Sequence, residues 1–108
     1  MTATPPTAPK HLKPATRRWW DAVVADFELQ AHHLRLLRLA CEAWDTGQAA
    51  REALAEHGLT YTDRFGAPRA RPEVAIERDS RISFARLTRE LGLDAGTPSE
   101  PPRPPALR

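Results

Sequence analysis

The sequence predicts a mostly α-helical protein, in which a helical hairpin core carries a short β-hairpin and a C-terminal helix. The helices are predicted because three segments place apolar residues three or four positions apart, and Gly58 and Gly92 stand where the two longer segments stop. The hairpin is predicted because residues 59–62 alternate apolar with polar side chains ahead of a glycine turn. The chain has 108 residues, which is room for one small domain.

Proline divides the chain into a foldable middle and two ends. Nine of the eleven prolines lie in residues 1–14 and 98–108, and segments of that composition do not bury a core. We therefore expect a flexible, basic, proline-rich arm over residues 1–14, a helical domain over residues 15–93 and a disordered proline-rich tail over residues 94–108. A domain of this size is marginally stable alone and often gains stability from partner subunits.

The first helix is expected from about Thr16 to Phe27, with the sequence TRRWWDAVVADF. Thr16 is a candidate N-cap, because its hydroxyl can accept a hydrogen bond from a backbone N–H. Trp20, Val23 and Phe27 recur at helical spacing and form one apolar stripe. Trp19 lies about 100° round the helix from Trp20, at the predicted edge of the core.

The second helix is expected from about Gln30 to His57, and Gly58 ends it as a cap residue. Its apolar positions occupy an arc of roughly 200°, about twice that of an ordinary surface helix. We therefore expect a central helix that is contacted from more than one direction. Gly47 lies within the arc, where it permits a close approach of another backbone. The arc comprises Leu36, Leu37, Leu39, Ala40, Cys41, Ala43, Trp44, Gly47, Ala50 and Leu54.

A short β-hairpin is expected within residues 59–72, LTYTDRFGAPRARP. Leu59 and Tyr61 alternate with threonines, Gly66 marks a turn, and the return strand is expected near Ala67–Arg71. A hairpin this small is not stable alone, so it must contact helices or a hairpin of a neighbouring subunit.

The last helix is expected from Pro72, which suits the first helical position, to a stop at Gly92. Its apolar residues form two stripes that are well over 100° apart. Two stripes need two packing surfaces, and we expect the chain's own helices to supply one and a second subunit to supply the other. The first stripe comprises Ile76, Ser80, Phe84, Leu87 and Leu91, and the second comprises Val74, Ile82 and Ala85.

No residue set in the sequence suggests catalysis or a bound cofactor. His32 and His33 diverge by about 100° on a helix, so they cannot chelate one metal ion, and a solvated or capping role is expected instead. Cys41, the single cysteine, is predicted to be an inert core residue. Glu42 and Asp45 share a helix face but lie on a predicted charged surface, without a desolvated pocket. We therefore expect neither an enzyme, nor a metal site, nor a cofactor.

The basic residues are the remaining candidates for function. The net charge is only +2, but residues 64–89 hold seven arginines against three acids. Local positive charge suits an anionic partner, and ordinary surface ion pairs are the alternative. The N-terminal arm can engage phosphates, with a solubilising tail as the alternative, and the hairpin arginines would form a ring of positive charge in an oligomer, with surface ion pairs as the alternative. The candidate residues for phosphate contacts with DNA are Lys10, Lys13, Arg17, Arg18, Arg64, Arg69 and Arg71.

The stretch RPEVAIERDSRISFARLTRELGLD opens a helix with proline and sets acidic and basic residues beside small apolar ones. It follows the hairpin TDRFGAPRARP and the helix exit LAEHGLTYTD. In this order of parts the sequence resembles the small subunit of phage terminase, in the family with a compact helical core, a short hairpin and a final helix. The resemblance covers about residues 12–94. The helix-turn-helix that many small subunits of other families carry is not evident here, which leaves the mode of DNA contact open.

The resemblance implies a non-enzymatic DNA-recognition component of a genome-packaging motor. Such subunits assemble into rings, bind viral double-stranded DNA, and recruit or regulate a large subunit that supplies ATPase and nuclease activity. We expect a homo-oligomeric ring whose contacts come mostly from the second and last helices, which carry surplus apolar surface. The tail is a candidate tether for the large subunit. The predicted interface residues are Leu36, Leu37, Trp44, Val74, Ile82, Phe84 and Leu87.

Two other functions stay open at this point. A small dimeric DNA-binding regulator would use the side of the last helix that carries Arg78, Arg81 and Arg89, whereas a scaffold protein would not bind nucleic acid. No apolar run approaches about 18 residues, and the N-terminus has no apolar signal region. We therefore expect no membrane segment, and we expect the cytoplasm of a bacterial host as the location.

Overall fold

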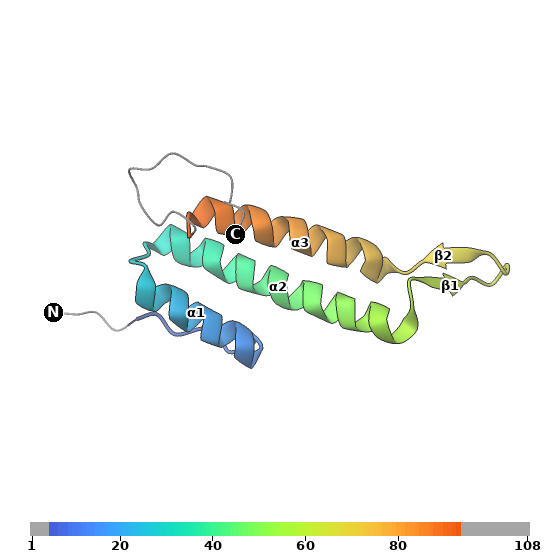
Figure 1. Cartoon of the computed structure of the whole chain (residues 1–108), viewed down its shortest axis with the longest axis horizontal. Coiled ribbons are helices and arrows are strands. Elements are labelled where there is room, and N and C mark those ends of the chain that lie inside the picture. Colours follow the sequence, from blue (N-terminus) through green and yellow to red (C-terminus); the bar gives the residue numbers. More distant parts are fainter. Residues whose placement is uncertain (1–4, 94–108) are drawn as a thin grey trace, which may run out of the picture.

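The computed structural model describes residues 5–93, which form three helices and one two-stranded antiparallel hairpin (Figure 1). The predicted tail, residues 94–108, and residues 1–4 lie outside the described residues. The mostly α-helical fold, the short hairpin and the C-terminal helix are as predicted. The elements are α1 (Pro14–Asp26), α2 (Ala31–His57), β1 (Thr60–Thr62), β2 (Pro68–Ala70) and α3 (Pro72–Leu91).

Helix α2 is the central element, because both other helices pack against it. Helix α3 runs antiparallel along one side of α2, and α1 lies against another side of its N-terminal half (Figure 1). The wide apolar arc of α2 is explained by these two neighbours, so the prediction of a helix contacted from more than one direction is confirmed.

Helices α2 and α3 approach each other closely at Gly47. A Cβ atom added at Gly47 would lie only 3.2 Å from the Cβ of Ser80 on α3. Two small residues facing each other let the helix backbones come close, at a cost of about 1 kcal/mol in helix propensity for the glycine relative to alanine. The prediction that Gly47 permits a close approach is confirmed.

The core lies between α1, α2 and the segment that precedes α1. Leu37 and Cys41 of α2 have no exposed surface at all, and Trp20 of α1 is 4% exposed. Leu12 is 3% exposed although it precedes the first helix, so the segment before α1 is part of the core. The buried cluster comprises Ala8, Leu12, Trp20, Val23, Leu37 and Cys41.

The prediction of a flexible arm over residues 1–14 is therefore wrong for residues 5–14. Leu12 and Ala8 are buried against the helices, and the indole N–H of Trp20 donates a hydrogen bond of 3.0 Å to the carbonyl oxygen of Pro6. Ala8 and Leu12 lie among the prolines and are enough to bury this segment. The segment packs across α1 instead of extending into solvent.

The start of α1 also differs from the prediction, since the helix begins at Pro14 with Lys13 as its N-cap. Thr16 is a buried residue of the first turn, and its hydroxyl donates to Oδ1 of Asp45 on α2. Oδ2 of the same carboxylate accepts the backbone N–H of Lys13 at 2.9 Å. Asp45 of α2 thus acts as a capping side chain for α1. It also places negative charge at the N-terminus of α1, where negative charge stabilises a helix.

A second acid of α2 holds the same segment. Oε2 of Glu42 lies 2.8 Å from Nε2 of His11 and accepts a 3.4 Å hydrogen bond from Nε of Arg38. Glu42 and Asp45 are three residues apart and therefore share one face of α2. The sequence analysis expected a charged surface here, and it did not predict that this surface binds the start of α1.

Helix α3 begins at Pro72 and is closed by Gly92, whose backbone is left-handed with φ of 68°. None of its 20 residues is fully buried. Ser80, Phe84 and Leu87 are half-buried, whereas Ile82 is 52% exposed. Most of the first apolar stripe therefore packs on the chain's own helices, although Ile76 is 41% exposed, while Ile82 in the second stripe is about half exposed.

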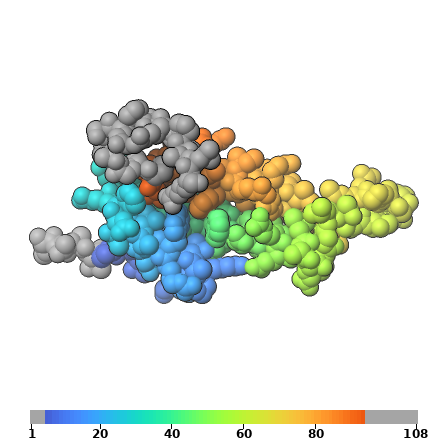
Figure 2. Space-filling model, in the orientation of Figure 1, coloured from blue at the N-terminus to red at the C-terminus, as the bar shows by residue number. Residues whose placement is uncertain are grey.

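The molecule is elongated, with extents of 64 × 37 × 25 Å and a radius of gyration of 18.0 Å. A compact chain of similar length has a radius of gyration of about 13 Å. The long α2–α3 pair ends in the hairpin, which projects from the helical body (Figure 2). Such a shape leaves a large helical surface available for contacts with other molecules.

We predict that replacing Asp45 by alanine lowers the free energy of unfolding by about 1–3 kcal/mol, because the buried Thr16 hydroxyl and the Lys13 N–H lose their acceptor. Chemical denaturation followed by circular dichroism measures this change. Asp21→Ala, which removes an exposed carboxylate of α1, is the matched control and is expected to change stability by less than about 0.5 kcal/mol. Equal effects of the two substitutions would contradict the role given to Asp45.

Candidate nucleic-acid interface

The β-hairpin is the most exposed part of the described chain. Its strands pair antiparallel, with Thr60 opposite Ala70, Tyr61 opposite Arg69 and Thr62 opposite Pro68, and every strand residue is exposed. The hairpin therefore gains little from packing, and its shape must come from its own turn.

Asp63 organises that turn. Its Oδ1 accepts the backbone N–H groups of Phe65 and Ala67, each at 2.9 Å, and its Oδ2 accepts Nε–H of Arg69 at 2.9 Å. Gly66 completes the turn with φ of 80°, a left-handed value that favours glycine. The sequence analysis did not single out Asp63, although an aspartate three residues before a glycine is typical of the first position of a turn.

Hydrogen bonds lower the pKa of Asp63 below its ordinary 3.8. The bond from Arg69 has the largest effect, and the bond from the Ala67 N–H has the next largest. A carboxylate whose pKa is lowered by folding stabilises the fold above its ordinary pKa. This contribution is lost as the pH falls from about 3.8 through the lower pKa of the folded state. The hairpin therefore keeps its turn at neutral pH.

The tip of the hairpin presents an aromatic ring beside a guanidinium group. Phe65 is 79% exposed, the largest value among the exposed large apolar side chains of the described chain. The Cζ atom of Arg64 lies 4.9 Å from the centre of the Phe65 ring, a cation–π distance. Arg64 thus lies beside an exposed ring on a turn that Asp63 holds in shape.

The three hairpin arginines predicted to bind DNA differ in availability. Arg64 is exposed, and its cation–π contact leaves its N–H groups open to solvent. Arg69 is exposed but already shares charge with Asp63. Arg71 is half-buried where β2 meets α3, and its backbone N–H donates to the carbonyl of Leu59 at 2.9 Å. Arg71 therefore contributes mainly to the junction, and Arg64 is the most accessible of the three.

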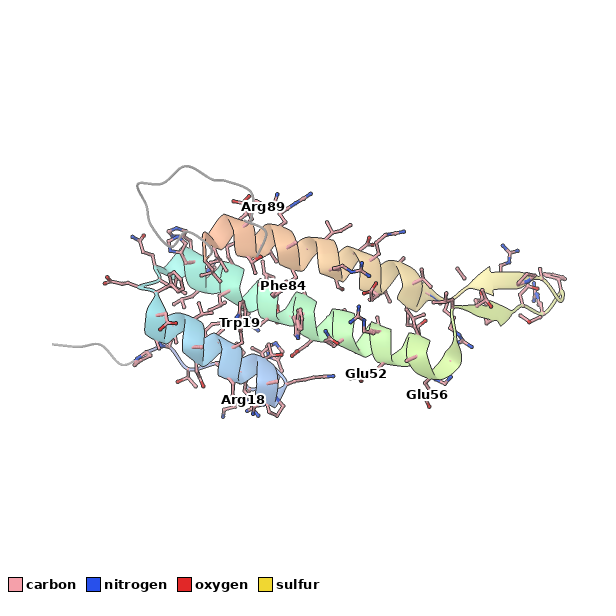
Figure 3. All side chains as sticks on the ribbon, in the orientation of Figure 1. Arg18, Trp19, Glu52, Glu56, Phe84 and Arg89 are labelled. Atoms are coloured by element: carbon pink, nitrogen blue, oxygen red, sulfur yellow. The ribbon has the colours of Figure 1, made fainter. Side chains whose placement is uncertain are left out.

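The second predicted group of basic residues lies around the start of α1. Lys10 and Arg18 are exposed, whereas Arg17 is half-buried. Nζ of Lys13 is 4.0 Å from Oε1 of Glu52 on α2, a long and exposed ion pair that is easily exchanged for another anion. Figure 3 shows Arg18 on the outer side of α1, with its side chain directed away from α2.

The two groups do not form one patch within a subunit. The hairpin stands at one end of the long axis, whereas the start of α1 lies beside the middle of α2 (Figure 1). DNA that contacts both groups must therefore follow the length of the molecule or pass from one subunit to another.

The arginines of α3 are partly neutralised by neighbouring acids. The guanidinium of Arg81 donates to both carboxylate oxygens of Glu77, four residues earlier, and Nε of Arg78 donates to Asp79 at 3.2 Å. The hydrogen bond with Arg81 lowers the pKa of Glu77, and the same bond raises the pKa of Arg81. These pairs disfavour α3 as a recognition helix with a free basic face.

The residues predicted to form a subunit interface fall into three environments. Leu37 is fully buried inside the subunit, so it has no surface with which to contact another one in this structure. Trp44 and Phe84 contact each other, with ring centres 5.0 Å apart. The remaining members are half-buried or exposed on α2 and α3, and they are Leu36, Val74, Ile82 and Leu87.

The histidine and cysteine side chains have structural contacts. Nδ1 of His33 accepts the backbone N–H of Gln30 at 3.2 Å at the start of α2, which is a capping role. Burial, with a smaller effect of Asp45 and Glu42, raises the pKa of the Cys41 thiol to about 12. A thiol with that pKa is unreactive at neutral pH. Within residues 5–93 no three His, Cys, Asp or Glu side chains gather closely enough to hold a metal ion.

A family match decides how these surfaces are to be interpreted. Residues 16–100 match the family described as phage terminase, small subunit. The chain belongs to the phage terminase small subunit family. No curated protein and no solved structure matches it. Among the described residues, none of the helices of this small subunit has the length and apolar character needed to cross a membrane.

Membership of this family assigns the chain a role in phage DNA packaging. The family match begins at Thr16 and extends through the three helices and the hairpin. The surfaces described above are therefore the surfaces available for the contacts that packaging requires.

Proposed function

We propose that this small subunit is the non-enzymatic DNA-recognition component of a phage packaging motor and that it assembles as a homo-oligomeric ring. The observation that carries the proposal is the family match over residues 16–100. In this role it binds viral double-stranded DNA in the cytoplasm of the bacterial host. It also recruits or regulates a large subunit that supplies ATPase and nuclease activity.

The hairpin tip is the proposed first contact with DNA. Arg64 reaches out from an exposed position, and the turn that carries it is fixed by three hydrogen bonds to Asp63. A preformed turn loses little conformational entropy on binding. Repeated around a ring, Arg64 and Arg69 give a circle of positive charge suited to phosphates. Lys10, Lys13, Arg17 and Arg18 supply a second band of phosphate contacts.

A ring requires two different, complementary surfaces on each subunit. Helix α3 offers one on its outer side, where Ile82 is 52% exposed. Leu39 of α2 is 51% exposed and lies near Leu36, on a side of α2 that faces away from α1. We assign the subunit contact to the outer side of α3 with Val74 and Ile82 on one subunit, and to Leu36, Leu39 and Leu87 on the next.

The alternatives are less well supported by the charges. A dimeric regulator that reads DNA with α3 would need unpaired arginines there. Arg78 and Arg81 are paired with neighbouring acids, which leaves only Arg89 of the three predicted arginines for that role. A scaffold that ignores nucleic acid would leave the arginines at the hairpin tip without a role. Binding of DNA at low salt distinguishes the scaffold from the other two functions.

We predict that the double substitution Arg64→Ala and Arg69→Ala weakens binding of double-stranded DNA and reduces its salt dependence. The slope of log K against log salt concentration should fall in magnitude by about 0.9 for each DNA phosphate that the variant no longer neutralises. Gel-shift titrations at several salt concentrations measure both quantities. Arg78→Ala is the matched control, because Arg78 is exposed but paired with Asp79. An unchanged slope in the double variant would contradict the hairpin as a DNA contact.

We predict that Ile82→Glu disrupts the ring, because it places a charge in the apolar centre of the proposed subunit contact. Native mass spectrometry should show a ring for the wild type and smaller species for the variant. Ala25→Glu adds the same charge on an exposed residue of α1 and is expected to leave the ring intact. A wild-type chain that is only a dimer would contradict the ring, and an intact ring of the Ile82 variant would move the interface elsewhere.

A further inference from the structure

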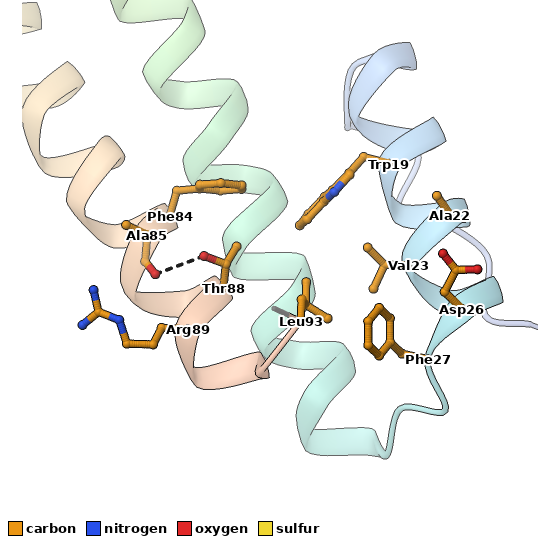
Figure 4. A pocket seen from close by; sticks show the side chains of 10 residues that line it. All are labelled: Trp19, Ala22, Val23, Asp26, Phe27, Phe84, Ala85, Thr88, Arg89 and Leu93. Atoms are coloured by element: carbon orange, nitrogen blue, oxygen red, sulfur yellow. Dashed lines mark hydrogen bonds between the residues drawn. The ribbon is translucent and has the colours of Figure 1, made fainter. Parts of the chain in front are cut away.

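A groove of about 600 Å³ runs between α1 and the C-terminal half of α3. Figure 4 shows Trp19 of α1 and Phe84 of α3 on opposite walls, with Leu93 at the end of the described chain between them and Phe27. The groove is mostly apolar, and Asp26 is the one carboxylate among its lining residues. Its apolar walls are partly exposed to water. A partner that covered them would be favoured by the free energy of burying apolar surface.

Three aromatic rings extend this groove along α1. The Phe84 ring centre lies 5.7 Å from that of Trp19 and 5.0 Å from that of Trp44. A second hollow of about 420 Å³ lies beside the same three rings and reaches Ala15 near the start of α1. The two hollows share Trp19 and Phe84, and Trp44, which lines only the second hollow, is 45% exposed.

The chain already binds a proline segment to a tryptophan on another side of α1. The residues before α1 read PPTAP, and the Trp20 indole N–H donates to the carbonyl of Pro6 at 3.0 Å. Aromatic grooves bind proline-rich segments in this way, because a proline backbone keeps a free carbonyl and a flat apolar ring. Trp19 is the adjacent tryptophan and faces the groove, with no proline segment of residues 5–93 against it.

The described chain ends inside the groove. Leu93 is a lining residue, and the 15 residues that follow it contain five prolines, in the sequence DAGTPSEPPRPPALR. A proline-rich segment therefore starts at an aromatic groove that has no occupant among residues 5–93. The segment needs no second molecule to reach the groove.

We propose that residues 98–105 of the same chain, PSEPPRPP, bind along this groove over Trp19, Phe84 and Trp44. The groove wall from Ala15 to Phe27 is about 18 Å long by helix rise, which matches about six residues of a polyproline helix. Eight residues in a polyproline helix span about 25 Å. Residues 94–97 connect the segment to Leu93.

Connectivity favours this occupant over a free peptide. The groove lining carries one acid, Asp26, and one base, Arg89, so charge does not select the occupant. Because a short connection joins the segment to the groove, its effective concentration is in the millimolar range, so weak contacts suffice. The segment covers the apolar groove and leaves the outer side of α3, with Ile82, free for subunit contacts.

The experiment uses the full-length chain with Pro101, Pro102, Pro104 and Pro105 all replaced by serine. Loss of the segment should expose Trp19 and Trp44, so the tryptophan emission should shift to longer wavelength and acrylamide quenching should increase. Ala106→Ser is the matched control, since it changes the tail without removing a proline. In a background with Trp19→Phe and Trp44→Phe, only the buried Trp20 reports, and the difference between proline and serine tails should disappear.

Two results would overturn the proposal. Emission and quenching that do not change with the proline substitutions would show that the tail does not cover the groove. Acrylamide quenching that increases when the wild-type protein is diluted would show that a second copy of the chain covers the groove instead. None of these readouts depends on DNA, so the result is separate from that of the proposed function.

Discussion

The close approach of α2 and α3 at Gly47 and Ser80 is the contact on which the rest of the structure depends. The two helices form an antiparallel pair with few fully buried side chains, because no residue of α3 is fully buried. Close packing of the two helix backbones along the pair must therefore stabilise it. Such close packing requires small residues where the helices cross. The position of the hairpin follows directly, since β1 and β2 connect the paired ends of α2 and α3 (Figure 1).

The place of α1 follows from a second, polar constraint. Glu42 and Asp45 bind the segment around His11 and Thr16, while Trp20 and Leu12 fill the core beside Leu37. These contacts fix α1 on α2, while Trp19 of α1 also contacts Phe84 of α3. The space between α1 and α3 is consequently an open groove lined by aromatic rings, and the outer side of α3 stays uncovered. The proposed DNA contact, the proposed subunit contact and the proposed tail binding therefore involve three different surfaces of a small chain.

The sequence predicted the elements well because their signals are local. Helical spacing, Pro72 and Gly92 define α3, and the wide arc of α2 requires the two neighbours that it has. The sequence did not predict that Asp45 would cap α1, because this contact joins residues 29 positions or more apart. It likewise did not predict that Leu12 would be buried, since proline-rich composition says nothing about the helix that the segment crosses.

The central claim is that α2 and α3 meet at nearly backbone distance at Gly47, and its most direct test is the free energy of unfolding of Gly47→Leu. Ala49→Leu, on an exposed position of the same helix, is the reference. We expect Gly47→Leu to be less stable by about 1–3 kcal/mol, because a side chain there must push Ser80 away, and Ala49→Leu to differ from wild type by less than about 0.5 kcal/mol. A Gly47→Leu protein as stable as the Ala49→Leu reference would contradict the close contact and the arrangement built on it.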